Sequence, residues 1–159
     1  MAAGLSQRFA GFPKQLLVCD GETLLDRQVR LFSNSLNLIY LVTHRTDLNH
    51  SNTVKLNPED RRIKATTLKS TTGKWNDENV LFLHGDVYFT ESAAQLISSN
   101  KSERIVFWGR GNEFYAMRVP IKCHNTAVKA IDLLIAHSPG TCENEAGLAH
   151  LHEVLRELG

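Results

Sequence analysis

Short apolar runs alternate along this chain with segments of helical period, and this alternation constrains the fold more than any other feature. Four of the runs are apolar on both faces, which is typical of strands buried on both sides in a sheet covered by helices. They lie at residues 38–43, 80–84, 104–108 and 114–119. The sequence therefore predicts an α/β domain with a largely parallel sheet.

Apolar residues at helical spacing predict the segments that cover such a sheet. These helices are expected at residues 24–36, 93–97, 127–135 and 148–158. Thr90 is a suitable N-cap for the second of them, with Glu91 in its first turn. The segment 44–79 is polar and weakly periodic; we predict one strand around residues 63–68 within it and otherwise a long functional loop.

Length, charge and cysteine content indicate the number of domains, the kinds of partner and the cellular compartment. The 159 residues suit one domain, expected over residues 1–159, and the net charge of +1 argues against a nucleic-acid or membrane-surface partner. No apolar run approaches the roughly 20 residues of a membrane span. Cys19, Cys123 and Cys142 are widely spaced and odd in number, which is typical of reduced thiols and predicts a cytoplasmic protein. The oligomeric state stays open, a homo-oligomer included.

The N-terminal stretch carries the chemistry of a phosphate-binding loop. Its small-residue turn consists of Ala2, Ala3, Gly4, Leu5 and Ser6. Successive backbone N–H groups in such a turn form a concavity that binds anions, and Gly4 can adopt backbone angles closed to other residues. Arg8 and Lys14 bring two cations to the same loop, one suited to bidentate contact with phosphate and one a compact charge. On these residues alone, a solvated surface turn explains the pattern equally well.

Two better-known nucleotide motifs do not fit the chain. The dinucleotide fingerprint needs G-x-G-x-x-G, and only Gly4 falls in the N-terminal window. A P-loop needs G-x-x-x-x-G-K-[ST], but Thr72-Gly73-Lys74 is followed by Trp75, and Leu68 stands where the first glycine would be. Neither motif explains the N-terminal stretch.

A carboxylate follows one of the predicted buried strands directly. The run at residues 80–84 leads into Gly85 and Asp86. In open α/β sheets, ligands bind beyond the carboxyl ends of the strands, where a carboxylate can hold a divalent cation that bridges the phosphates of an NTP. By itself the Gly-Asp dipeptide is equally typical of an ordinary turn, so it becomes informative only together with the N-terminal loop.

The N-terminal stretch resembles the signature loop of the nucleotidyltransferase superfamily. The shared order is Met-Ala-Ala-Gly-Leu-Ser-Gln-Arg-Phe, followed by Pro-Lys-Gln-Leu. The superfamily includes the sugar-1-phosphate nucleotidyltransferases and the molybdenum-cofactor guanylyltransferase type, and its members pair this loop with a Gly-Asp motif at the end of a buried strand. Gly21, Leu24 and Leu25 match its Gly-x-x-Leu-Leu pattern. The resemblance is dense over residues 1–32 and returns over residues 80–97.

The resemblance implies a three-layer, Rossmann-like nucleotidyltransferase fold with a mostly parallel mixed sheet flanked by helices. It implies transfer of a nucleoside monophosphate from an NTP to a sugar phosphate or another small phosphorylated acceptor, with release of pyrophosphate. Arg8 and Lys14 would stabilise charge on the triphosphate and on the transition state, and Asp86 would hold Mg²⁺. Thr72 and Gly73 would contact the nucleotide together with residues 2–6.

The chain departs from the superfamily pattern at both ends. Members usually run a buried first strand into the Ala-Ala-Gly turn and continue beyond the last helix to a strand with another aspartate. We therefore expect a single domain without the usual first and C-terminal strands. The alternative to an active enzyme is a non-catalytic nucleotide-binding or interaction domain derived from the same fold. A glycosyltransferase would need a D-x-D metal motif, whereas Asp86 is followed by Val87 and Tyr88.

Other candidate residues have weaker support. The seven histidines show no zinc-site spacing. Arg110 is a candidate for contact with an acceptor phosphate, although a solvated arginine explains it as well. Candidates for a second metal ligand are Glu113, Glu143, Asn144 and Glu145.

Overall fold

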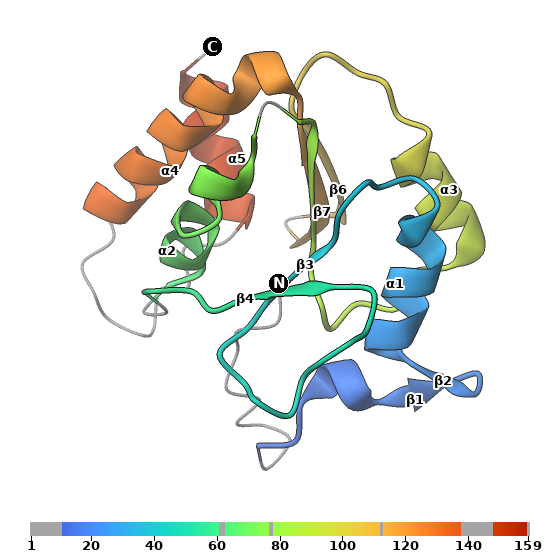
Figure 1. Ribbon diagram of the computed structural model, residues 1–159. Coiled ribbons are helices and arrows are strands. Elements are labelled where there is room, and N and C mark those ends of the chain that lie inside the picture. The colour runs from blue at the N-terminus through green and yellow to red at the C-terminus, as the bar shows by residue number, and fades with distance from the viewer. Residues whose placement is uncertain (1–10, 61–62, 77, 112, 138–147, 159) are drawn as a thin grey trace. The chain divides into compact units, whose positions relative to one another are not determined.

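The computed structural model describes residues 11–60, 63–76, 78–111, 113–137 and 148–158 (Figure 1). The chain divides into two compact units. The first comprises residues 1–57 and 84–101, and the second residues 58–83 and 102–159. Among the described residues, no helix combines the length and the apolar character that a membrane crossing needs.

The first unit contains two short strand pairs and the helices that flank them. Its elements are η2 (Lys14–Leu16), β1 (Val18–Cys19), β2 (Glu22–Thr23), α1 (Leu24–Ser33), β3 (Tyr40–Val42), β4 (Val54–Leu56) and α3 (Glu91–Ser98). β1 pairs antiparallel with β2, and β3 pairs parallel with β4. The helices predicted at residues 24–36 and 93–97 are therefore present, as is the strand predicted at residues 38–43.

The core of the first unit forms around α1. Leu25 and Val29 of α1 pack with Leu41 of β3 and with Leu48 in one cluster of buried side chains. On the same unit, α1 contacts α3, as Figure 1 shows. α1 thus packs against β3, the segment around Leu48 and α3.

Threonine side chains cap both of these helices. The Thr23 hydroxyl accepts a hydrogen bond from the backbone N–H of Asp26 at 3.0 Å, where α1 begins. The Thr90 hydroxyl accepts one from the backbone N–H of Ala93 at 3.2 Å, where α3 begins. The N-cap role predicted for Thr90 is confirmed.

The second unit combines an antiparallel sheet with a group of helices. Its elements are α2 (Lys64–Lys69), η3 (Thr72–Lys74), β5 (Val80–Leu83), β6 (Val106–Arg110), β7 (Glu113–Val119), η4 (Ile121–Cys123), α4 (His124–His137) and α5 (Leu148–Glu157). The strand order is β5-β7-β6. α4 contacts α2 and α5, and α5 contacts β7 (Figure 1). Met117 of β7, Ile131 of α4 and Leu151 of α5 are fully buried.

The described residues contain three small sheets, so the prediction of one mostly parallel sheet is wrong for them, although the mixed α/β character is confirmed. The runs at residues 104–108 and 114–119 form β6 and β7, which pair antiparallel. Only the two residues 111 and 112 connect these strands, whereas a parallel pair needs a crossover of about a dozen residues or more. Gly111 has a φ of 59°, the left-handed conformation that such a hairpin turn requires.

The segment 63–68 forms the helix α2 and not the predicted strand. Ala65 and Leu68 are completely buried three positions apart, on one face of the helix. The Thr66 hydroxyl donates a hydrogen bond to the carbonyl oxygen of Ile63 at 2.8 Å. This β-branched residue therefore makes a side-chain hydrogen bond within the first turn of the helix. β4 lies inside the part of residues 44–79 that we predicted to be a long loop.

Gly109→Ala is expected to destabilise the second unit. A Cβ atom at this position would lie 2.0 Å from the carbonyl oxygen of Glu113 and 2.8 Å from the Cα atom of Phe114. Because both are backbone atoms, the β6-β7 hairpin has to shift, and we expect a loss of about 1–3 kcal/mol in the free energy of unfolding, measured by urea denaturation. Gly73→Ala is the control, since a Cβ there meets nothing within 4 Å. Equal stability of the two variants would contradict the prediction.

Candidate functional site

Of the predicted phosphate loop at residues 2–14, the structure describes residues 11–14. The earlier site residues of this loop, which lie outside the described residues, are Ala2, Ala3, Gly4, Leu5, Ser6 and Arg8. Pro13 precedes η2, and its carbonyl oxygen accepts a hydrogen bond from the backbone N–H of Leu16 at 3.0 Å. Lys14 is therefore the first of the two central residues of a hydrogen-bonded turn.

Lys14 and Asp86 lie together in the first unit, although 72 positions separate them in the chain. Nζ of Lys14 donates to Oδ2 of Asp86 at 3.3 Å. The exposed fractions of the two side chains are 34% for Lys14 and 38% for Asp86, so solvent and small ligands can reach both. The structure thus brings together two residues that the sequence analysis assigned to a triphosphate and its cation. Their action on a triphosphate stays a prediction.

Asp86 lies in a tight turn that follows β5 in the chain. The backbone N–H of Val87 lies 3.4 Å from the carbonyl oxygen of His84 and closes this turn. Gly85 and Asp86 are its two central residues. The direction of the Asp86 side chain is therefore set by a four-residue turn.

Two polar side chains of α1 hold the loop that contains this turn. Nε2 of Gln28 donates to the carbonyl oxygens of His84 at 3.0 Å and Val87 at 2.8 Å. Nε of Arg27 donates to the carbonyl oxygen of Phe89 at 2.8 Å. Both side chains are buried, with exposed fractions of 8% and 7%. We did not predict either residue as part of the site, although a polar residue on the apolar face of a predicted helix signals a buried partner.

Glu22 gathers the arginines of α1 into a network of ion pairs. Its carboxylate accepts from Nη1 of Arg27 at 2.8 Å and from Nη2 of Arg30 at 2.7 Å. Arg30 also reaches the carboxylate of Glu91 at 3.1 Å. The hydrogen bond from Arg30, assisted by Arg27, lowers the pKa of Glu22 to about 2, while desolvation acts in the opposite direction. The network ties the start of α3 to α1.

A pH dependence of stability follows from this lowered pKa. Because folding lowers the pKa of Glu22 from an ordinary 4.5 to about 2, its carboxylate stabilises the fold above pH 4.5 and loses that contribution as the pH falls towards 2. We expect Glu22→Gln to reduce the free energy of unfolding by a constant amount near neutral pH and by a shrinking amount below pH 4.5. Urea denaturation of both proteins across this range is the measurement. A difference that persists undiminished at the acid end would contradict the expectation.

Tyr88 borders the same network. The guanidinium carbon of Arg27 lies 4.3 Å from the centre of the Tyr88 ring, a cation–π contact. The phenolic hydroxyl donates a hydrogen bond to the carboxylate of Asp20, and this bond, with desolvation, raises the pKa of Tyr88. Arg27 therefore contacts the loop after Asp86 through both a carbonyl oxygen and a ring.

Thr72 and Gly73 lie in η3 of the second unit, after a helix and not after the strand that the sequence analysis expected. The Thr72 hydroxyl donates to the carbonyl oxygen of Lys69 at 2.9 Å, which satisfies one of the last carbonyl groups of α2. The neighbouring Thr71 is buried and accepts the indole N–H of Trp75 at 3.1 Å. A nucleotide contact by Thr72 and Gly73 stays a prediction.

The remaining candidates are not gathered at one place among the described residues. Arg110 and Glu113 face each other across the end of the β6-β7 hairpin in the second unit. The carboxylate of Glu113 accepts the hydroxyl of Tyr115 at 2.8 Å. The other suggested metal ligands, Glu143, Asn144 and Glu145, lie outside the described residues.

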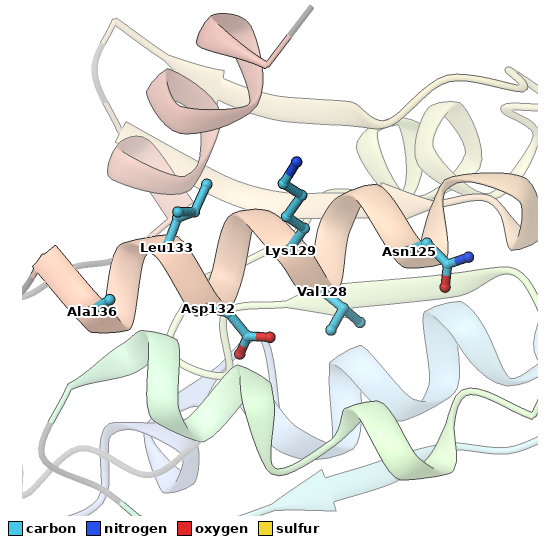
Figure 2. Close-up of a pocket in the computed structure, with 6 residues that line it drawn as sticks. All are labelled: Asn125, Val128, Lys129, Asp132, Leu133 and Ala136. Atoms are coloured by element: carbon cyan, nitrogen blue, oxygen red, sulfur yellow. The ribbon is translucent and has the colours of Figure 1, made fainter.

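A groove along α4 is lined by that helix alone (Figure 2). Its lining residues are Asn125, Val128, Lys129, Asp132, Leu133 and Ala136. Lys129 and Leu133 point to one side of the helix, and Val128 and Asp132 to the other (Figure 2). The carboxylate of Asp132 pairs with Nζ of Lys69 at 2.8 Å. No predicted site residue that the structure describes lines this groove, so we do not place it in the candidate site.

Comparison with known proteins gives a family that spans both units. The family model described as a MobA-like NTP transferase domain matches residues 1–152. All residues that the sequence analysis assigned to the nucleotide, the metal and the transfer step fall within this range. No curated protein matches the chain.

Proposed function

The chain belongs to the MobA-like NTP transferase family, and from this we propose that it transfers a nucleoside monophosphate from an NTP to a small phosphorylated acceptor. The family implies nucleotidyl transfer from an NTP. The acceptor class, a sugar phosphate or a similar small phosphate ester, is our proposal. So is the view that residues 1–159 act as one NTP-transferase domain.

The proximity of Lys14 and Asp86 supports this proposal most directly. Nucleotidyl transfer needs a positive charge for the triphosphate and an anionic ligand for the cation that accompanies it. Lys14 and Asp86 offer these two groups 3.3 Å apart, both partly exposed. They come from the two sequence motifs that the proposal depends on.

The carboxylate of Asp86 has the chemistry of a magnesium ligand. In sites that bind NTPs, Mg²⁺ is usually held by one or two carboxylates, while water and substrate phosphates complete its shell. The Asp86 carboxylate already holds a cation, the ammonium group of Lys14, and remains partly exposed. When bound, Mg²⁺ would neutralise negative charge on the phosphates of the NTP.

In the proposed reaction, a phosphate oxygen of the acceptor attacks the α-phosphorus of the NTP. The bond from that phosphorus to the bridging oxygen breaks, and pyrophosphate leaves with the bonding electrons. The acceptor phosphate is already ionised, so the step needs no general base. Lys14 and Arg8 would bind the triphosphate and stabilise the charge that develops on the leaving pyrophosphate. Residues 2–6, with Thr72 and Gly73, would position the nucleotide.

Pyrophosphate release tests the proposal. The four common NTPs would each be combined with a set of phosphorylated sugars and alcohols, with and without Mg²⁺. We expect Mg²⁺-dependent release for at least one combination. If a folded sample is stabilised against heat by an NTP but releases no pyrophosphate, the chain is a non-catalytic nucleotide-binding domain and the proposal is wrong.

A further inference from the structure

Gln28 stands on the buried face of α1, where an apolar residue would be expected. Its exposed fraction is 8%, close to the 8% of Leu25 and the 4% of Val29 on the same helix. A buried amide destabilises a protein unless its hydrogen-bonding groups find partners. The partners of this amide therefore explain what the residue does.

The Gln28 amide bridges the two ends of the turn that contains Asp86. Its nitrogen donates to the carbonyl oxygens of His84 and Val87. Carbonyl oxygens only accept hydrogen bonds, so the amide nitrogen, which carries two N–H groups, must face them. The bond that closes the turn, from the backbone N–H of Val87, ends on the same oxygen of His84. One side chain thus fastens both ends of the turn to a helix in the core.

We propose that Gln28 is a positioning residue for the Asp86 carboxylate. Gly85 and Asp86 are the central residues of the turn, so fixing His84 and Val87 fixes the direction in which the Asp86 side chain leaves the backbone. A ligand held in one orientation binds a cation without first losing conformational freedom. This inference rests on the proposed function, in which Asp86 holds a divalent cation.

Arg27, the neighbour of Gln28, does not have this role. Its bond to the loop ends on the carbonyl oxygen of Phe89, beyond the turn. Its other contacts are with the carboxylate of Glu22 and the ring of Tyr88. Arg27 therefore holds the loop at Phe89 and does not fix the two ends of the turn that contains Asp86.

Two substitutions of Gln28 test the inference, because they leave the side chain with different numbers of hydrogen-bond donors. Gln28→Met keeps the length of the side chain and removes both N–H groups, whereas Gln28→His keeps one N–H at a similar reach. Residues that orient a metal ligand typically change metal affinity by about 10–100-fold. We expect the dissociation constant for Mn²⁺ alone, followed by electron paramagnetic resonance, to rise by about 10-fold or more in Gln28→Met and by a smaller factor in Gln28→His. Hydrogen exchange of the Val87 amide should accelerate in the same order.

Val29→Ala is the matched control. Val29 is the next residue of α1 and is buried in the core cluster with Leu25, Leu41 and Leu48. Its truncation should lower the thermal stability without changing Mn²⁺ binding or the exchange of the Val87 amide. If Gln28→Met and Val29→Ala behave alike, Gln28 only stabilises the fold and the inference is wrong. If Gln28→Met does not fold, Gln28→His decides by the same two measurements.

Pyrophosphate release measured in parallel separates this inference from the proposed function. Weaker Mn²⁺ binding in Gln28→Met, without turnover in the wild type, contradicts the proposed function and supports the positioning role. Turnover in the wild type, with unchanged Mn²⁺ binding in both Gln28 variants, overturns the positioning role alone. A wild type that shows no binding of Mn²⁺ alone overturns the positioning role, and pyrophosphate release then decides on the proposed function separately.

Discussion

Asp86→Asn is expected to abolish metal-dependent turnover, with a loss of at least about 100-fold, because a neutral amide replaces the charged oxygen that a divalent cation needs. The fold should survive this change. The side chain of Asp86 is 38% exposed, and its pair with Lys14 is a surface ion pair of the kind that contributes about 0–1 kcal/mol. The turn is closed by backbone groups of His84 and Val87, which the substitution leaves in place.

Pyrophosphate release over a range of Mg²⁺ concentrations measures the effect, and thermal unfolding checks the fold. Asp132→Asn is the matched control, because Asp132 is also an exposed aspartate paired with a lysine, at 2.8 Å from Nζ of Lys69. Its activity should equal that of the wild type. Full activity in Asp86→Asn would show that this carboxylate is not part of the active site.

The two described ends of the candidate site could be predicted because each belongs to a short local motif. Lys14 follows a turn of small residues, and Asp86 follows a buried apolar run. Their separation of 3.3 Å could not be predicted, since 72 positions lie between them. It depends on how α1 holds the loop after β5, and that hold runs through backbone carbonyl groups. Every residue has such a carbonyl, so no sequence pattern marks which of them the Gln28 amide binds.

The helices could be predicted more securely than the pairing of the strands. Helix caps and apolar faces are local, as Thr90 illustrates, whereas the direction of two paired strands depends on the connection between them. The connection between β6 and β7 does carry a local signal, since Gly111-Asn112 between two apolar runs is typical of a hairpin. At residues 63–68 the predicted strand is wrong, because the burial of Ala65 and Leu68 on one face stabilises a helix.

Lys14→Ala is expected to weaken productive binding of the triphosphate by roughly 10–100-fold, because a hydrogen bond to a charged group contributes about 1.5–3 kcal/mol. In the absence of nucleotide, the same substitution should have the opposite effect on a divalent cation. The Lys14 ammonium lies 3.3 Å from the Asp86 carboxylate, and a positive charge there opposes the binding of a second cation. Lys14→Ala should therefore bind Mn²⁺ alone more tightly than the wild type does.

Fluorescence anisotropy of a labelled NTP and electron paramagnetic resonance of Mn²⁺ measure the two constants separately. Lys69→Ala is the matched control, since it removes the lysine of the pair with Asp132 and should leave both constants unchanged. General damage to the fold would weaken both kinds of binding, so shifts in opposite directions can only arise from the charge of Lys14 beside Asp86. If both constants match those of Lys69→Ala, Lys14 takes no part in binding the triphosphate.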